Sequence, residues 1–494
     1  MTGTTQVVKK SALYNDGSTL YIDGQWLASS QTYSRVDPAD TGRVTGVFAS
    51  ASDEDVSRAY AAAALAQQGW ADATVHVRAG VLHRAADILE GRLEKAAHRL
   101  TADMGKAIRD ARAEVQRSVA ILRYYSGELL QPTGETYPSA DSETLLMTME
   151  QPLGIVCAIT PWNFPFAIPT WKLAPALGFG NTVVWKPAEA ASGSAVFLTE
   201  TLVEAGLPRG VLNLITGSGR ALSGALTGDQ RLSGLTFTGS DGVGSRLRQA
   251  VSDRNVKVQL ELGGKNPAIV LDDADLADAA EQVARGAMGA TGQRCTATSR
   301  VYVQKGVAAR FVDLLLARIS VLQVGDPRSQ TTDIGPLASA EQRDTVASYI
   351  EVARSDGARI LLGGRVDQIG CFAEPTVLSQ VPSDSRLWRE EIFGPVLLIA
   401  EVDNYASALA AANDSGYGLS ASLFTSDIGT ALDFARRSQS GLVHINRETA
   451  TVEPHVPFGG IKGSSSMQRE QGKAARAFFT ITKTVYIRTR SRHQ

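Results

Sequence analysis

The sequence predicts an α/β fold with two mostly parallel β-sheets, and two features of the chain point to it. From residue 153 onward, short runs rich in β-branched residues, such as LGIVCAIT, NTVVWKPA and VKVQLEL, alternate with segments of helix length. A second set of such runs extends from NPAIVL to GLVHIN, again with helical segments between them. Because strands that alternate with helices form right-handed βαβ units, each set should build a parallel sheet covered on both faces. We expect the two sheets to divide at Gly263-Gly264.

The segment before residue 130 has a different pattern. In TLYIDGQWL the apolar residues alternate around Asp23-Gly24, which predicts a hairpin. The segments DEDVSRAYAAAALAQQGW and RAGVLHRAADILEGRLEKAAHRL carry apolar residues three and four positions apart. That spacing predicts helices that bury one face and expose their charges to solvent.

The composition is that of an ordinary soluble globular protein. Hydrophobic residues form 44% of the 494 residues, charged residues form 20%, and the net charge is -2. Basic residues are interspersed with acids, so we expect no nucleic acid partner. No apolar leader region and no run of roughly 18 apolar residues is found, so we expect a cytoplasmic protein with no membrane partner. The three cysteines lie far apart without a CxxC pair, so we expect neither a disulfide framework nor a metal site.

The ends of the first two strands carry candidate binding residues, because ligands bind beyond the carboxyl ends of strands in an open parallel sheet. The run PWNFP holds Asn163 between two prolines that fix the backbone, although a plain proline-rich turn is the alternative. The run KPAE ends the second strand, where Glu189 could accept hydrogen bonds from an adenosine ribose and would repel a 2′-phosphate. Glu189 therefore indicates NAD, whereas Lys186 beside it could neutralise that phosphate. A surface ion pair is the alternative for both.

The later strands end in glycines and a carboxylate. The turns ITGSGR and FTGSDGVG, with Gly219 and Gly239, could bring backbone N–H groups to a phosphate, or be ordinary strand-to-helix turns. In NVKVQLELGG, the alternation places Glu261 opposite the most apolar face, just before two glycines. A carboxylate in such a cleft can have a raised pKa and act as a general base, with an exposed edge glutamate as the alternative.

Cys295 lies in the polar run TGQRCTATSR, beyond the apolar stripe of the helix that precedes it. A cysteine outside the core and directly after a cation, Arg294, is favoured as a thiolate nucleophile. Cys157 lies inside an apolar strand and is expected to be structural. Cys371 has no comparable setting.

Seven motifs in this order, PWNFP, KPAE, FTGS, LELGGKNP, GQRC, EEIFGP and PFGG, resemble the aldehyde dehydrogenase superfamily from about residue 20 to about residue 488. The resemblance implies a Rossmann-like cofactor-binding domain, a second α/β catalytic domain and a small β oligomerisation arm whose last strand crosses to a partner subunit. The implied domains are residues 1–129 with 152–262, residues 263–462, and residues 130–151 with 463–494. A homodimer or homotetramer is therefore expected.

The resemblance also implies roles for single residues. Cys295 would add to the aldehyde carbon, Asn163 would hold the oxyanion with the backbone N–H of Cys295, Glu261 would activate the hydrolytic water, and Lys172 would relay protons. The cofactor would be NAD, preferred on Glu189, with NADP also usable. The implied cofactor-binding residues are Thr160, Pro161, Trp162, Lys186, Glu189, Gly219, Thr238, Gly239, Ser240, Leu262, Glu391 and Phe393.

Two stretches, GQRCTATSR and HINRETATVEPHVPFGG, look most like the branch that oxidises α-ketoglutaric semialdehyde (2,5-dioxopentanoate), with succinic semialdehyde dehydrogenases next. An acidic substrate needs a cation for its far carboxylate, because an unpaired buried carboxylate is costly. The candidate substrate residues are Phe164, Trp171, Arg294, Arg447, His455 and Phe458. Arg447 on a surface loop, and Arg294 paired within the fold, are the alternatives.

Three other functions remain open at this point. A thiol hydrolase would need a histidine to activate Cys295, and only His444 and His455 lie in the same α/β half. A non-catalytic member of the fold would not be expected to keep Cys295, Glu261 and Asn163 together. A coenzyme A-dependent acylating dehydrogenase would have no need for Glu261, because it does not activate water.

Overall fold

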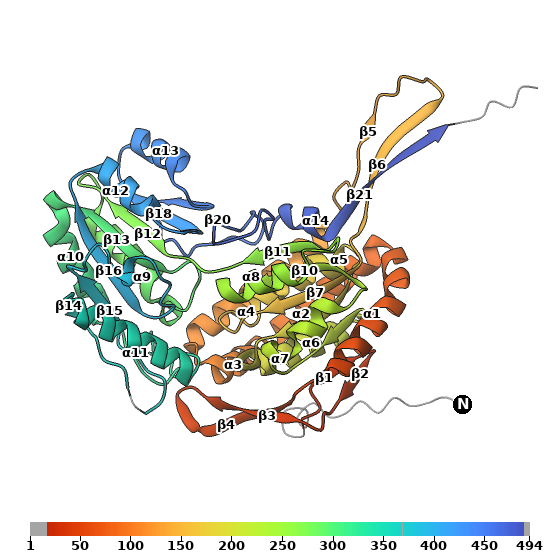
Figure 1. The fold of residues 1–494 in the computed structure, drawn as a ribbon, viewed down its shortest axis with the longest axis horizontal. Helices are drawn as coiled ribbons and strands as arrows, with labels where there is room; N and C mark the ends of the chain where they lie inside the picture. Colours follow the sequence, from red (N-terminus) through yellow and green to blue (C-terminus); the bar gives the residue numbers. More distant parts are fainter. Residues whose placement is uncertain (1–16, 368, 489–494) are drawn as a thin grey trace, which may run out of the picture.

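The computed structural model describes residues 17–367 and 369–488, and it contains the two α/β units that the strand pattern predicts (Figure 1). The first sheet has the order β11-β10-β7-β8-β9-β1-β2, with parallel pairing from β11 to β9. Its strands are β1 (Leu20–Ile22), β2 (Gln25–Leu27), β7 (Ile155–Thr160), β8 (Thr182–Pro187), β9 (Leu212–Leu214), β10 (Leu232–Thr238) and β11 (Lys257–Glu261).

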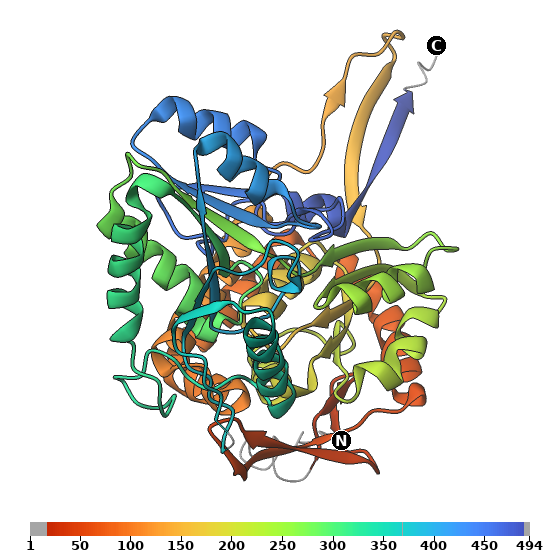
Figure 2. The ribbon, with the colours of Figure 1, turned by 60° about the vertical axis from the view of Figure 1, so that its left-hand side comes forward.

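Helices cover both faces of this sheet (Figures 1 and 2). The predicted hairpin at Asp23-Gly24 is confirmed, since β1 pairs antiparallel with β2 and both turn residues have positive φ. The two predicted amphipathic segments form α1, α2 and α3, because Arg92 interrupts the second segment between two helices. The helices of this unit are α1 (Asp53–Asp72), α2 (Val75–Gly91), α3 (Leu93–Met104), α4 (Ile108–Glu128), α5 (Ala167–Gly178), α6 (Ser192–Glu204), α7 (Gly219–Gly228) and α8 (Asp241–Ala250).

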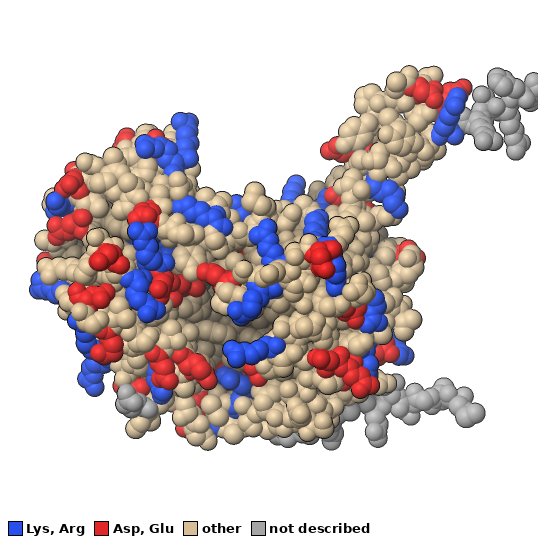
Figure 3. Space-filling model, in the orientation of Figure 1, with Lys and Arg blue, Asp and Glu red and all other residues tan. Residues whose placement is uncertain are grey.

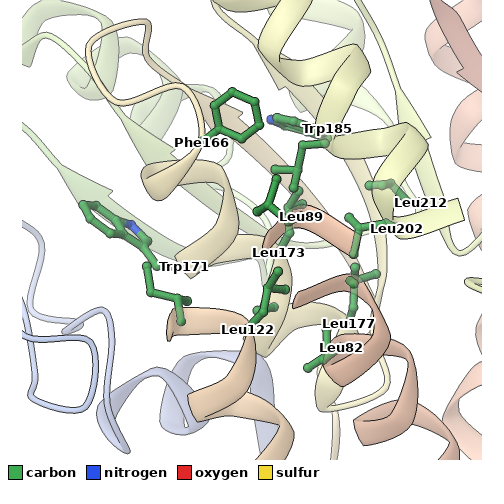
Figure 4. Close-up of a cluster of buried hydrophobic side chains, with 14 of the residues drawn as sticks. Leu82, Leu89, Leu122, Phe166, Trp171, Leu173, Leu177, Trp185, Leu202 and Leu212 are labelled. Carbon is green, nitrogen blue, oxygen red and sulfur yellow. The ribbon is translucent and has the colours of Figure 1, made fainter. Parts of the chain in front are cut away.

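The core of the first unit lies where α2, α4, α5 and α6 pack on one face of the sheet (Figure 4). Leu89 and Leu122 from the helices meet Leu173 of α5 and Trp185 of β8, and all four side chains are buried. Burying a leucine side chain contributes about 1.5 to 3 kcal/mol. This packing fixes α4 and α5, which carry one wall of the site described below.

The second sheet has the order β14-β15-β16-β13-β12-β18-β19 and is parallel except for β14. Its strands are β12 (Asn266–Val270), β13 (Thr298–Gln304), β14 (Arg359–Leu362), β15 (Thr376–Ser379), β16 (Val396–Val402), β18 (Ser420–Phe424) and β19 (Leu442–Ile445). Its helices are α9 (Leu276–Met288), α10 (Lys305–Ser320), α11 (Ala340–Ser355), α12 (Tyr405–Asn413) and α13 (Ile428–Arg437). The chain passes from the first sheet to the second at Gly263-Gly264, between β11 and β12.

A three-stranded antiparallel arm projects from the body (Figure 1). It consists of β5 (Thr136–Tyr137), β6 (Thr144–Pro152) and β21 (Thr480–Arg488), and β21 follows α14 (Ala474–Phe479). The predicted arm segment 463–494 divides in the structure. Residues 464–466 lie beside β11, where Leu262 N donates to Ser464 O (2.7 Å) and Ser466 N donates to Leu260 O (2.9 Å).

The remaining elements lie outside the two large sheets and the arm. They are β3 (Thr32–Asp37), β4 (Asp40–Ala49), β17 (Tyr417–Gly418), β20 (Ile461–Lys462) and three 3-10 turns, η1 (Glu189–Ala191), η2 (Gly289–Gly292) and η3 (Arg386–Trp388). Acidic and basic side chains are interspersed over the face shown in Figure 3. Among the described residues, no helix is long and apolar enough to cross a membrane, and no group of acidic, histidine and cysteine side chains is arranged to hold a metal ion.

Candidate active site

The site lies where the carboxyl ends of the first sheet meet the amino ends of the second. β7, β8, β10 and β11 are parallel, so they end on the same edge. The chain leaves β7 toward β8 on one side and reaches β10 on the other, and ligands bind at such a switch point. Cys295 precedes β13 and Glu391 precedes β16, so both belong to loops at the amino ends of the second sheet.

The glycines between the sheets allow this close approach. A Cβ on Gly263 would lie 2.6 Å from Glu391 Oε2, and one on Gly264 would lie 2.4 Å from the carbonyl oxygen of Cys295. No side chain fits at such distances, so glycine at both positions lets the β11 end pack directly against the two loops of the second sheet.

Asn163 is buried in the turn between β7 and α5 and is held from both ends. Its side-chain Nδ2 donates to the carbonyl of Gln293 (3.0 Å), two residues before Cys295. Its own carbonyl accepts from Lys106 Nζ (2.7 Å). Lys106 forms a fully buried ion pair with Glu114, whose Oε1 accepts from the first N–H groups of α5. The amide is therefore fixed beside the Cys295 loop, where a carbonyl oxygen could receive its second N–H.

The loop that carries Cys295 begins with a left-handed turn. Ala290 and Thr291 have φ of 51° and 60°, an uncommon conformation for residues other than glycine. Gly292 continues the turn, and Asn266 Nδ2 anchors the loop by donating to the carbonyls of Cys295 and Ala297 (both 2.8 Å). The thiol is thus exposed to a cavity, while its backbone is fixed to β12.

The thiol of Cys295 has a raised pKa, which corrects the expectation that Arg294 favours the thiolate. Burial is the main cause, followed by the negative charges of Glu391 and Glu261. The Arg294 guanidinium lies over the ring of Phe164, 5.9 Å from its centroid, instead of compensating for these carboxylates. The thiol of the free protein is therefore protonated at neutral pH, and a base must accept its proton when it reacts.

Glu261, at the end of β11, is buried beside a second carboxylate. Its Oε2 accepts from Ser465 Oγ (2.5 Å), whereas its Oε1 has no hydrogen-bond partner. Burial and the charge of Glu470 raise the pKa of Glu261 well above its ordinary range, partly opposed by the Ser465 hydrogen bond and by Lys172. A carboxylate with one free oxygen and a raised pKa is suited to accept a proton from water.

Lys172 acts on Glu261 by its charge and pairs with a residue that the motifs did not reveal. Its buried Nζ forms an ion pair with Glu470 and donates to Thr236 Oγ1 (2.8 Å), which donates to Gln259 Oε1 (2.9 Å). Glu470 lies in the segment that packs beside β11 and belongs to none of the seven motifs. The pairing of this segment with β11, seen only in the structure, brings Glu470 to the site.

The predicted cofactor residues gather along the same edge. Thr160 ends β7 and is followed by Pro161 and Trp162. Lys186 is the penultimate residue of β8, Glu189 follows that strand, and Gly219 begins α7. Lys186 Nζ lies 3.2 Å from where a Cβ on Gly219 would be, so glycine leaves room above the ammonium. Burial lowers the pKa of Lys186 to about 8, and Glu189 opposes this effect.

The other predicted cofactor residues lie at the ends of β10 and β11 and in the facing loop of the second sheet. Thr238, Gly239 and Ser240 lead from β10 into α8, and Leu262 follows β11. From the second sheet, Glu391 accepts a hydrogen bond from Gly264 N (2.8 Å), and burial raises its pKa to about 8. Trp162 and Phe393, from opposite sheets, make an edge-to-face contact with centroids 5.4 Å apart.

This surface fits a dinucleotide. Thr238 Oγ1 is buried without a hydrogen-bond partner, at a strand end that leads into the N-terminus of α8. The capping residue Ser240 makes no side-chain hydrogen bond to the first turn of α8, so that hydroxyl and the first N–H groups of the helix can meet a phosphate.

A cavity of about 480 Å³ opens on the other side of Cys295. Of the predicted substrate residues, Phe164, Trp171, Arg294 and Phe458 line it. Arg447 and His455 do not, which corrects their prediction: both side chains are exposed, because the loop presents Val452 and Pro454 to the cavity instead. The cavity also contains Arg117 and Lys106, two cations that the motifs did not indicate. Lys106 lies in the link before α4 and Arg117 in the middle of that helix, where a basic residue is typical of a solvated face.

Comparison with known proteins identifies relatives over nearly the whole chain. Residues 26–485 match the aldehyde dehydrogenase family. The chain is 46% identical to an alpha-ketoglutaric semialdehyde dehydrogenase of Bacillus subtilis over 475 residues, which cover 95% of this chain and 97% of that protein. It is 40% identical to an alpha-ketoglutarate semialdehyde dehydrogenase of Haloferax volcanii, with 95% and 99% covered. The crystal structure of an NAD-dependent aldehyde dehydrogenase from Sinorhizobium meliloti is similar, with a TM-score of 0.93, 34% identity, and 98% and 96% covered.

Proposed function

The chain belongs to the aldehyde dehydrogenase family, and from that premise we propose that this NAD(P)-dependent enzyme oxidises an acidic semialdehyde, α-ketoglutaric semialdehyde first, to its carboxylic acid. One observation carries the proposal. Cys295 separates a cavity that contains arginines from a cofactor surface, and Glu261 reaches the same point from the first sheet. The high identity to enzymes named for this substrate supports the choice of semialdehyde.

The first half of the reaction acylates the enzyme. The sulfur of Cys295 would form a bond to the aldehyde carbon as the thiol gives its proton to solvent water in the cavity, and the carbonyl oxygen would become negative. Asn163 Nδ2 and the backbone N–H of Cys295 would donate to that oxygen, an interaction worth several kcal/mol when the donors are fixed in advance. The contacts of Asn163 with Gln293 and Lys106 support this role, because they hold the amide without a substrate.

The second half releases the product. When bound, the nicotinamide cofactor accepts the hydride that leaves the substrate carbon, so the substrate remains on Cys295 as a thioester. The free oxygen of Glu261 would take a proton from water as that water attacks the thioester. The acid then leaves, and the sulfur regains a proton. Lys172 and Glu470 would pass the proton of Glu261 onward, since they form a buried ion pair whose charges both act on Glu261.

NAD is proposed as the preferred cofactor on Glu189, with NADP also usable. The carboxylate of Glu189 would accept from the ribose hydroxyls, whereas a 2′-phosphate would be repelled. Lys186 reduces this repulsion, because its ammonium lies in the same turn region and its pKa is about 8. The cofactor residues named above would hold the adenosine, the pyrophosphate and the nicotinamide ribose in that order along the edge.

We also propose a homo-oligomer assembled through the arm. β21 and β6 carry apolar side chains that are 41% to 71% exposed. These are Leu145, Met149, Ile481, Tyr486 and Ile487. A strand with exposed apolar residues on a projecting arm is a surface for pairing with another copy. Light scattering of the wild-type chain gives the mass, and a monomer at micromolar concentration would contradict this assembly.

The substrate proposal is tested with a panel of aldehydes. We expect the wild-type enzyme to prefer semialdehydes of four and five carbons that carry a carboxylate over neutral aldehydes of equal length, when nicotinamide reduction is followed with each cofactor. Cys295→Ala should lose turnover by at least about 10⁴-fold while dinucleotide affinity stays the same. Cys371→Ala, at a buried cysteine that does not line the cavity, is the matched control. Normal turnover by Cys295→Ala would overturn the covalent mechanism.

A further inference from the structure

Two arginines in the cavity beside Cys295 form no ion pair among the described residues, although the charges of Glu453 and Glu114 act on Arg117 from a distance. Arg117 projects from α4, and Arg294 directly precedes Cys295. Neither guanidinium forms an ion pair with an acid in residues 17–367 and 369–488. In both side chains the Nε atom is buried and has no hydrogen-bond partner. Arg35 and Arg476 also have a buried Nε without a hydrogen-bond partner. The distinguishing feature of Arg117 and Arg294 is therefore that both line the cavity without an ion pair among the described residues, where a negatively charged ligand could supply the acceptors.

The positions of the two guanidinium groups are constrained by the cavity walls. Arg117 Nη1 donates to the carbonyl of Val452 (2.8 Å), and its Nη2 is 3.4 Å from Gln471 Oε1. Its guanidinium carbon lies 5.8 Å from the Trp171 ring centroid. Arg294 is placed in the same way against Phe164. Aromatic faces hold both cations without neutralising them, so each keeps free N–H donors.

The acidic side chains of the cavity either form an ion pair or hydrogen bonds within the protein, or lie at the cavity edge. Glu114 forms its ion pair with Lys106 and accepts from two backbone N–H groups. Asp110 accepts from Ala290 N (3.0 Å). Glu453 is exposed on the loop that borders the cavity. The interior thus has two cations without an ion-pair partner among the described residues, and the third, Lys106, is paired with Glu114.

We propose that Arg117 is a specificity-determining residue that binds, together with Arg294, the carboxylate at the far end of the substrate. The proposal rests on the proposed oxidation of an acidic semialdehyde and adds the residue that selects it. A forked guanidinium matches a carboxylate with two parallel hydrogen bonds. An extended five-carbon semialdehyde spans on the order of 5 Å between its two end carbons, from C–C bonds of about 1.5 Å, so its aldehyde can lie at Cys295 while its carboxylate stays inside the same cavity.

The test compares charged and neutral substrates in Arg117→Met. We expect KM for α-ketoglutaric semialdehyde to rise roughly 10- to 100-fold, from the loss of hydrogen bonds to a charged group, while kcat changes little. Pentanal, a neutral aldehyde of the same length, should be oxidised as by the wild type. Glutarate, a dicarboxylate without an aldehyde, should inhibit the variant more weakly by a similar factor. Arg123→Met, on the solvent side of α4 where Arg123 pairs with Asp87 and Glu90, is the matched control.

Further variants separate a binding role from a structural role. Arg117→Lys keeps the charge without the fork and should recover part of the lost affinity for the acidic substrate only. Arg294→Met tests the other half of the pair and should also raise KM for the acidic substrate, even if Arg117→Met does not fold. An unchanged KM for the acidic semialdehyde in folded Arg117→Met, or an equal loss for pentanal, would overturn the proposal. A wild-type enzyme that prefers pentanal would instead refute the proposed substrate class, because that result does not depend on any variant.

Discussion

The two sides of Cys295 differ in charge. The cavity side has Arg117 and Arg294 without acidic partners, whereas the cofactor side has Glu261, Glu391 and Glu470 buried close together. Cations on one side of the sulfur and carboxyl groups on the other would divide the work: in the proposed mechanism the cations bind the acid of the substrate, and the carboxyl groups transfer protons. The acidic side dominates the thiol, since the pKa of Cys295 is raised and the two causes after burial are carboxylates.

The two sides also come from different parts of the fold. The carboxylate Glu261 follows a strand end, and Asn163 and Lys186 lie at or beyond the ends of parallel strands. The cations of the cavity come from a helix and from a loop at the amino end of β13. Loops and helix faces can change their charges without disturbing a sheet, which makes the cavity the side where substrate preference varies.

Removing the general base should give the largest effect, and it should change only the acidic side of Cys295. Glu261→Gln keeps the hydrogen bond with Ser465 but cannot take a proton from water. We expect one burst of reduced cofactor, equal to the enzyme concentration, followed by steady turnover about 10²- to 10⁴-fold below the wild type. Mass spectrometry should detect the acylated Cys295. The same preference for acidic over neutral aldehydes should persist in the burst, because the cavity is unchanged.

A Glu261→Gln enzyme with no burst would contradict the assignment of Glu261 to thioester hydrolysis. In that case Glu261 would be needed before hydride transfer, for instance to accept the thiol proton. Glu150→Gln, a half-buried glutamate on β6 in the arm, serves as the matched control and should show normal turnover.

Asn163→Ala should have the next largest effect, on the acylation of Cys295, which lies between the two sides. Losing one fixed donor to an oxyanion costs about 10²- to 10³-fold in kcat. Acylation slows, so the burst should slow by the same factor, unlike the burst of Glu261→Gln. Alkylation of Cys295 by iodoacetamide should proceed at the wild-type rate, because that reaction develops no oxyanion. A normal burst rate with slow turnover would assign Asn163 to deacylation only.

The sequence predicts the acidic side better than the cavity side, for a physical reason. Parallel strands place all their carboxyl ends on one edge, so strand order and a residue's place at a strand end suffice to bring Asn163, Glu189 and Glu261 together. Cys295 lies at the amino end of a strand of the second sheet, where that rule does not apply. The polar residues around Cys295 and the family motif GQRC predict its role instead.

The residues that escaped sequence analysis reach the site by long-range packing. Glu470 arrives because residues 464–466 pair with β11, about 200 positions away in the chain. Arg117 lies on a helix whose exposed face also carries arginines, so the sequence does not show which of them points inward. Arg447 and His455 illustrate the converse: a favourable charge in a loop makes a residue a candidate, whereas in the structure both side chains are exposed, which agrees with the surface-loop alternative for Arg447.

Changing the cofactor preference should produce a moderate effect that leaves both sides of Cys295 intact. In Glu189→Ser the repulsion of a 2′-phosphate is removed while Lys186 remains to attract it. We expect the ratio of kcat/KM with NADP to that with NAD to rise about tenfold, the size expected for one hydrogen bond with a charged group. KM for the aldehyde should stay the same. A constant ratio would show that Glu189 does not contact the adenosine ribose.

The smallest expected effect is a shift in the pKa of Cys295, which reports the charge of the acidic side. Glu391 is the first carboxylate among the causes that raise the pKa of Cys295, and its own pKa is about 8. A nearby negative charge disfavours the thiolate, so removing that charge must lower the pKa of the thiol. In Glu391→Gln without cofactor, the pH midpoint for alkylation by neutral iodoacetamide should therefore move down, by up to about 1 unit. Glu189→Gln, whose charge is not among those acting on the thiol, should not move it. A midpoint that stays or rises in Glu391→Gln would mean that burial alone keeps the sulfur protonated, and the charge difference between the two sides would then have no influence on the nucleophile.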